Sequence, residues 1–179
     1  MLKNLFRTRS AERMGLPLYS AAVDQARRPE FYTALGVSDE IDARFELYTL
    51  HVLLLILRLR DEGGADAERG AEAAQNLFDV YVSALDHALR ELGVNDVTMA
   101  KKMRRLGEQL YGRMTTYEAP LRSGDAAGLA DGLARNVYAS TELQSAQALA
   151  DYGLAAREGL AKQSIDEVLV APIWPEVTA

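Results

Sequence analysis

Cysteine is absent from this chain of 179 residues, which excludes disulfides, thiolate metal sites and cysteine nucleophiles. Histidine is scarce, because His51 and His87 are the only two and neither has a second histidine at metal-binding spacing. The sequence also lacks a phosphate-binding loop, a dinucleotide fingerprint, a zinc-protease motif and a nucleophile elbow. We therefore expect no metal, no cofactor and no catalytic residues, and predict that the protein is not an enzyme.

Positive charge is in short supply, with 20 Lys and Arg against 26 Asp and Glu and a net charge of −6. DNA binding needs a basic face for the phosphates and is not expected. The longest run of large apolar residues, from Val52 to Leu57, is far shorter than the roughly 20 residues of a membrane span. The N-terminal cations Lys3, Arg7 and Arg9 precede no apolar core, so no secretory signal is expected.

The composition is 49% hydrophobic and 26% charged, which is typical of a globular protein. Alanine and leucine dominate and strand-like alternation is missing, which predicts helices throughout. We expect a single-domain, all-α bundle of about six to eight helices. Helices are expected at 16–27, 29–36, 39–62, 67–92, 96–117, 125–139 and 141–162, with another after Ser164.

Several residues are expected to begin or end these helices. Gly36 suits a left-handed C-terminal cap, and Ser164-Ile165-Asp166-Glu167 has the spacing of a capping box. The expected N-caps are Ser38 or Asp39, Asp96 or Thr98, Asp125 and Thr141, and Pro120 marks the end of a helix. We expect an N-terminal segment 1–15 that is flexible or lies on a surface, a helical domain 16–170 and an irregular tail 171–179.

The helix expected at 39–62 is apolar nearly all round, which is typical of a central core helix. Its exceptions, Arg44, His51 and Arg58, recur every seven residues and lie along one line. The next helix carries an acidic line with the same period. If the two helices pack antiparallel, a single register pairs each residue of the first line with an acidic residue of the second, which would form a polar ladder. The alternative is that the two lines are unrelated faces in contact with solvent. The hypothetical pairs are Arg44 with Asp86, His51 with Asp79, and Arg58 with Glu72.

Single polar residues on these helices are candidates for metal binding or acid–base catalysis, but structural roles are favoured. His51 lies in line with two arginines, a poor setting for a cation, so a hydrogen-bonded structural histidine is expected. His87 has charged neighbours and is expected at the surface. Glu46 and Glu118 could serve as acid–base groups, but single carboxylates on helices are usually solvated or paired.

One basic cluster is unusual on this acidic chain: Lys101, Lys102, Arg104 and Arg105. It is a candidate partner-binding site that could meet anionic lipid headgroups, ribosomal RNA or an acidic partner, and the alternative is a solvated helix face. The same helix carries apolar residues at spacings of three and four, which favours a packing seam over a methionine-lined binding surface. They are Met99, Met103, Leu106, Leu110, Met114, Tyr117 and Leu121.

Five segments, taken in order, carry a resemblance to a known family. They are Tyr32-Thr33-Ala34-Leu35-Gly36-Val37, Arg44-Phe45-Glu46-Leu47 with His51, Leu77-Phe78-Asp79, Asp86-His87-Ala88-Leu89-Arg90-Glu91-Leu92-Gly93-Val94, and Tyr111-Gly112-Arg113 with Tyr117. In this order and spacing, over roughly half of the chain, they resemble the ubiquinol–cytochrome c chaperone family. The motif residues are Tyr32, Gly36, Arg44, Phe45, Glu46, His51, Asp79, Asp86, Arg90, Gly93, Tyr111, Gly112 and Arg113.

The resemblance implies a helical assembly factor of respiratory complex III that binds newly made cytochrome b. It also implies the ribosome or a partner chaperone as further partners, and peripheral contact with the inner membrane from the cytoplasm or, in a eukaryote, from the matrix side. The basic cluster would then contact ribosome or membrane, and the methionine-bearing helix or the tail around Trp174 would offer apolar surface to the client.

Two other readings remain open. A helical protein that binds a lipid or a quinone would need a large enclosed apolar cavity. The ligand domain of a regulator is less favoured, because the helix-turn-helix and basic face that would accompany it are missing.

Overall fold

The computed structural model describes residues 2–91, 96–140 and 143–178, with side chains from Met14 onward except 96–103, 105, 106, 109, 143 and 145. Helices are the only regular elements in this part of the chain, and the prediction of a single all-α domain is confirmed. The elements are α1 (Leu2–Ala26), α2 (Pro29–Thr33), α3 (Ile41–Arg60), η1 (Gly64–Asp66), α4 (Ala67–Glu91), α5 (Asp96–Ser123), α6 (Ala126–Asn136), η2 (Leu143–Ala146), α7 (Gln147–Ala161) and α8 (Ile165–Val170).

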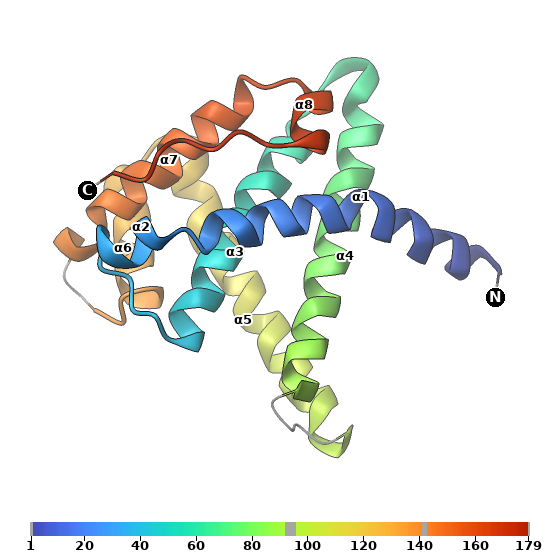
Figure 1. Ribbon diagram of the computed structural model, residues 1–179, viewed down its shortest axis with the longest axis horizontal. Coiled ribbons are helices and arrows are strands. Elements are labelled where there is room, and N and C mark those ends of the chain that lie inside the picture. Colours follow the sequence, from blue (N-terminus) through green and yellow to red (C-terminus); the bar gives the residue numbers. More distant parts are fainter. Residues whose placement is uncertain (1, 92–95, 141–142, 179) are drawn as a thin grey trace.

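The helix α3 is the central helix of the bundle, as its composition predicts. Every residue from His51 to Leu59 is buried, and α3 packs against α1, α4, α5 and α7. A helix enclosed on all sides must be apolar nearly all round. The helix α1 lies across α3 and α4, while α6 and α7 pack together at the other end of the molecule (Figure 1).

Several predicted helix ends are confirmed. Asp125 caps α6, because its side chain accepts a hydrogen bond from the Gly128 amide at 2.9 Å. Ser164 and Glu167 form the predicted capping box of α8. Gly36 adopts φ +67° after α2, a conformation that costs little only without a Cβ atom. The tail after Ala171 is not helical, as predicted.

Other boundaries differ from the prediction. The helix α1 begins at Leu2 and not near residue 16, so Pro17 lies inside it and not in its first turn. Neither Ser38 nor Asp39 caps α3, whose N-cap is Glu40 with no side-chain hydrogen bond. The helix α5 continues past Pro120 to Ser123, and both Pro120 and Leu121 are buried there, so packing holds the last turn in place. Thr141 lies outside the described residues.

The predicted polar ladder between α3 and α4 is wrong. Arg44 bonds to Asp39 at 2.6 Å. His51 bonds to the Tyr152 hydroxyl of α7, and Arg58 donates to the Leu160 carbonyl of the same helix. The Arg58 guanidinium donates to the carbonyls of Leu160 and Gln163 and pairs with Glu62. A period of seven fixes a line on each helix, but not how far the two helices are rotated toward each other.

Asp61, just after α3, ties three helices together. Its carboxylate accepts from Arg122 of α5 at 2.8 Å and from Arg157 of α7. At the opposite end, the last turns of α4 and the first turns of α5 extend beyond the other helices (Figure 1). Ala88, in this part of α4, is exposed although it is apolar.

Candidate functional site

The family-motif residue His51 lies in the middle of a buried chain of hydrogen bonds. Its Nδ1 lies 2.8 Å from the Leu47 carbonyl, and its Nε2 lies 2.9 Å from the Tyr152 hydroxyl. A carbonyl can only accept, so Nδ1 carries the proton and Nε2 accepts from Tyr152. The Tyr152 hydroxyl in turn accepts from the Gln25 side-chain amide at 3.0 Å. The chain thus joins α1, α3 and α7.

Aromatic rings complete the enclosure of His51, whose exposed fraction is 0%. The rings of Phe31 and Trp174 lie edge-on to the imidazole, with centroids 5.3 and 5.2 Å away. Burial disfavours the charged form and lowers the pKa of His51 to about 4. The imidazole is enclosed and bonded at both nitrogens within the protein, which agrees with the hydrogen-bonded structural histidine that the sequence predicts.

A second buried polar contact joins α3 to α5. Arg113 donates from Nε to Glu46 Oε1, which brings together two family-motif residues 67 positions apart. Burial raises the pKa of the Glu46 carboxyl, although the bond to Arg113 opposes that shift. Glu46 Oε2 is buried without a hydrogen-bond partner in the described part of the chain. The pair therefore holds α3 and α5 in one position relative to each other, although removing the two charges from water costs free energy.

The C-terminal tail is anchored over this core by one glutamine. The Gln163 side chain donates to the Ile173 carbonyl and accepts from the Ile173 amide, both at 2.8 Å. This two-point contact places the next residue, Trp174, against His51. Gln25, Tyr152 and Gln163 were not singled out from the sequence, because no local pattern distinguishes them from other polar residues on helices.

The remaining motif residues do not converge on one site. Asp86 pairs with Arg90 on α4 at 2.8 Å, and Asp79 accepts from Gln75. Tyr32 is half-buried and donates to the Ala26 carbonyl at 3.0 Å. Phe45 packs partly buried against the core, whereas Tyr111 is 75% exposed and Gly112 is exposed beside it. Gly93 lies outside the described residues.

The predicted basic cluster lies in the first half of α5, on the end of the molecule that extends beyond the other helices (Figure 1). Arg104 is exposed, whereas the side chains of Lys101, Lys102 and Arg105 lie outside the described residues. In the same helix Leu110, Tyr117 and Leu121 are buried. The predicted packing seam is confirmed for these residues, while Met99, Met103 and Leu106 lie outside the described side chains. His87 is exposed, as predicted.

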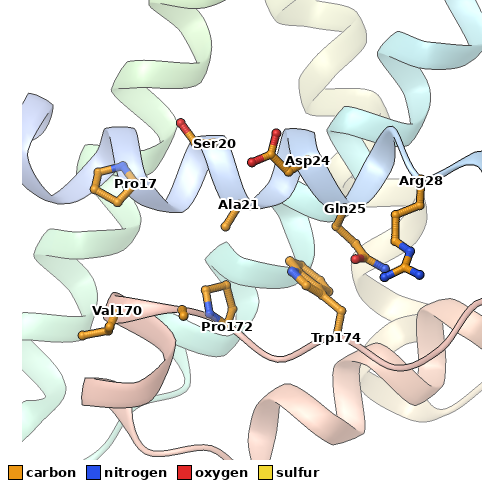
Figure 2. A pocket seen from close by; sticks show the side chains of 10 residues that line it. Pro17, Ser20, Ala21, Asp24, Gln25, Arg28, Val170, Pro172 and Trp174 are labelled. Carbon is orange, nitrogen blue, oxygen red and sulfur yellow. The ribbon is translucent and has the colours of Figure 1, made fainter.

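Among the clefts on described residues, two are open to solvent. One, of about 460 Å³, runs between α1 and the tail and has Trp174 in its wall (Figure 2). The other, of about 370 Å³, lies between α2 and the start of α3 and is lined by the motif residues Tyr32 and Arg44. In the described part of the chain, no helix combines the length and the apolar character needed to cross a bilayer.

Comparisons with known proteins point to one family. Residues 33–175 match the family described as Ubiquinol-cytochrome C chaperone. The ubiquinol-cytochrome-c reductase complex assembly factor 1 of Xenopus laevis is 25% identical over 122 residues, which is 68% of this chain. The chain spans 58% of the length of that relative. The crystal structure of the Cbp3 homolog from Brucella abortus superposes with a TM-score of 0.80 at 31% identity, covering 99% of this chain and 98% of that chain.

Proposed function

Because the chain belongs to the ubiquinol-cytochrome C chaperone family, we propose that it is a non-enzymatic assembly chaperone for the ubiquinol–cytochrome c reductase complex. Its proposed client is newly made cytochrome b. The observation that carries the proposal is the family match over residues 33–175. The motif residues found in the sequence end at Tyr117, but the match continues well past that point. It includes α3 and α7, which carry His51 and Tyr152, and most of the C-terminal tail.

The polar contacts in the core of the bundle support binding over catalysis. His51 and Arg113 form hydrogen bonds with other groups of the protein. Partner binding instead uses surface, and large apolar side chains are exposed at several places in the described part of the chain. They are Leu16, Ile41, Tyr111, Val170 and Ile173. We take these residues as candidate positions for contact with a protein partner.

The basic cluster of α5 belongs to the same proposal. We place the contact with an anionic surface, either the ribosome or the inner membrane, at Lys101, Lys102, Arg104 and Arg105. The exposure of Arg104 supports this assignment. A protein that receives a membrane protein as it is made works beside the membrane, so we propose peripheral association with its inner face.

The competing function is the binding of a lipid or a quinone. It requires an enclosed apolar cavity, whereas the cleft beside α1 and the cleft beside α2 are both open to solvent. We therefore favour a protein partner and keep the small ligand as an outcome of the test.

Affinity capture tests the proposal directly. A tagged copy is purified from gently solubilised cells and the eluate is analysed for cytochrome b and for lipids and quinones. We expect cytochrome b to co-purify, and cells without the protein to accumulate less assembled complex III while the other respiratory complexes keep their levels. A quinone in the eluate without cytochrome b would refute the chaperone proposal in favour of ligand binding.

A further inference from the structure

The C-terminal tail, residues 171–178, has the composition of a short peptide ligand. It is not helical, and Pro172-Ile173-Trp174-Pro175 has the P-x-x-P spacing of segments that dock into aromatic-lined grooves. Proline holds the backbone of such a segment in an extended conformation before it binds. The segment therefore loses little conformational entropy when a groove takes it up.

The tail is attached to the rest of the molecule by few buried side chains. Within residues 171–178, Val177 alone is buried, with 9% of its surface exposed. Trp174 is partly buried against the core, whereas Ile173 is 66% exposed. Trp174 and Val177 lie three residues apart, which is the repeat of a polyproline II helix. A segment with so few buried contacts opens locally at a low cost in free energy.

The tail is held through its backbone by a single side chain. The Gln163 amide group donates to the Ile173 carbonyl and accepts from the Ile173 amide, both at 2.8 Å. One glutamine thus satisfies both backbone polar groups of one residue, as a neighbouring β-strand would. Because the Ile173 side chain itself is exposed, this contact recognises an extended backbone and not a particular side chain.

An aromatic pocket beside Gln163 receives the next side chain of the tail. Trp174 extends from the tail toward α1 (Figure 2), and its ring lies edge-on to the buried His51 ring, with centroids 5.2 Å apart. Phe31 and Tyr152 enclose the same imidazole, with centroids 5.3 and 5.6 Å from it. The bonds from Gln25 to Tyr152 and from Tyr152 to His51 do not involve the tail. The floor of the pocket is therefore formed by α1, α3 and α7.

We propose that the tail is an intramolecular ligand of this groove, defined by Gln163, His51 and Tyr152, and that an extended segment of a protein partner can take its place. The backbone of the partner segment bonds to Gln163, and an aromatic residue followed by proline enters the pocket. An aliphatic residue three positions after the aromatic one replaces Val177. The tail keeps the groove filled until the partner displaces it. The inference goes beyond the proposed function, because it holds for any protein partner with such a segment.

A labelled peptide with the sequence of residues 170–178 tests the proposal on the full chain. The tail competes at an effective concentration on the order of millimolar, so the unchanged protein should bind this peptide weakly. The Trp174→Ala variant removes the ring that holds the tail, and we expect it to bind the peptide about tenfold more tightly. Ile173→Ala is the matched control in the tail, at an exposed position, and should bind as the unchanged protein does.

Changes in the groove and in the peptide complete this experiment. In the Trp174→Ala background, Gln163→Leu should weaken peptide binding about tenfold by removing two hydrogen bonds, whereas Gln147→Leu, at an exposed glutamine of α7, should not. A peptide that carries Trp174→Ala should not bind. Equal binding of the two peptides, equal effects of the two glutamine changes, or no binding to a folded Trp174→Ala variant would each overturn the inference.

Trp174 gives a second readout on the unchanged protein, because it is the only tryptophan of the chain. A peptide that carries Trp174→Phe, added at about millimolar concentration, should displace the tail. The Trp174 emission should then shift to the red and become easier to quench with acrylamide. An unchanged spectrum would overturn the inference even where the Trp174→Ala variant does not fold. Neither readout uses cytochrome b, so failure to capture cytochrome b from cells would overturn the proposed client and not this inference.

Discussion

The surroundings of His51 keep its imidazole neutral at pH 7, because burial lowers its pKa to about 4. Its two nitrogens are engaged by a carbonyl and a tyrosine hydroxyl, and three aromatic rings surround it. Replacing it would leave the Tyr152 hydroxyl and the Leu47 carbonyl buried without this partner, which costs about 1–3 kcal/mol per group. The residue is therefore structural, even though it belongs to the family motif.

The buried imidazole predicts an acid-sensitive fold. The pKa of His51 falls from 6.5 to about 4 on folding, so the unfolded chain binds the extra proton between these values. This contribution to stability is complete above pH 6.5 and is lost as the pH falls toward 4. We expect the free energy of unfolding to fall by about 2–3 kcal/mol between about pH 7 and about pH 4.5 from this residue.

Urea titrations across this pH range measure the effect. The His51→Gln variant should be less stable at neutral pH and should lose less stability on acidification than the unchanged protein. His87→Gln, at an exposed position, is the matched control and should follow the unchanged protein. Parallel pH profiles for the His51→Gln variant and the unchanged protein would contradict the assignment of a buried neutral imidazole.

The Glu46–Arg113 pair gives a second prediction at the residue scale. In the Arg113→Ala variant the buried Glu46 carboxylate loses its cation, and we expect a loss of about 2–4 kcal/mol. Burial already raises the pKa of Glu46, and without Arg113 it rises further. The folded variant then takes up a proton as the pH falls, so its loss of stability should be smaller at about pH 5 than at about pH 8. An equal loss at both pH values would argue against this. Glu46→Gln in the Arg113→Ala background should restore part of the stability.

Close contacts between helices decide how these elements pack. Gly70, at the start of α4, lies against the end of α3, and a Cβ atom there would meet the Leu59 carbonyl oxygen and lie 2.8 Å from Glu62 Cβ. Gly15 of α1 makes a similar approach to α4, where a Cβ atom would lie 2.9 Å from Val80 Cγ2. Backbone atoms cannot move aside as a flexible side chain can, so the spacing of α3 and α4 depends on Gly70.

Substitution of glycine by alanine separates packing from helix propensity. Gly70→Ala is expected to cost about 1–3 kcal/mol because it forces α3 and α4 apart. Gly112→Ala, in the middle of α5 with no atom within 4 Å of the added Cβ, should gain about 0.5–1 kcal/mol from helix propensity alone. Thermal and urea unfolding measure both changes. If the two variants gain stability alike, the close approach of α3 and α4 is refuted.

At the scale of the whole molecule, the buried polar contacts and the basic cluster lie in different places. The hydrogen-bonded core occupies the middle of the bundle, whereas the start of α5 extends away from it (Figure 1). The cleft between α1 and the C-terminal tail lies on another part of the surface (Figure 2).

The basic cluster can be tested against an equal change of charge elsewhere. We expect the variant with Lys101, Lys102, Arg104 and Arg105 all changed to Gln to capture several-fold less cytochrome b from cells and to keep its melting temperature. The control changes four other cations, Arg60, Arg69, Arg135 and Lys162, to Gln; it has the same net charge, and its surface ion pairs contribute little to stability. Equal loss of capture in both variants would mean that only net charge matters, and no loss in either would remove the cluster from the binding surface.

The sequence by itself determined the all-helical class, the central position of α3 and most helix boundaries. Apolar periodicity, glycines and capping residues act over a few neighbouring positions, so they can be read from the chain. The same signals failed at Pro17 and Pro120, where packing keeps a helix intact through a proline. Motif order also identified the family, because the resemblance needs no three-dimensional contact.

Only the tertiary structure decided which polar groups meet. His51 bonds to Tyr152, which is 101 residues away, and Glu46 bonds to Arg113; the predicted ladder paired His51 with a residue of α4 instead. The cleft lined by Pro17 of α1 and Trp174 of the tail joins segments that are far apart in the sequence. Helix periodicity fixes the face on which a residue lies but not the rotation of one helix against another, and that rotation is set by the packing of the whole core.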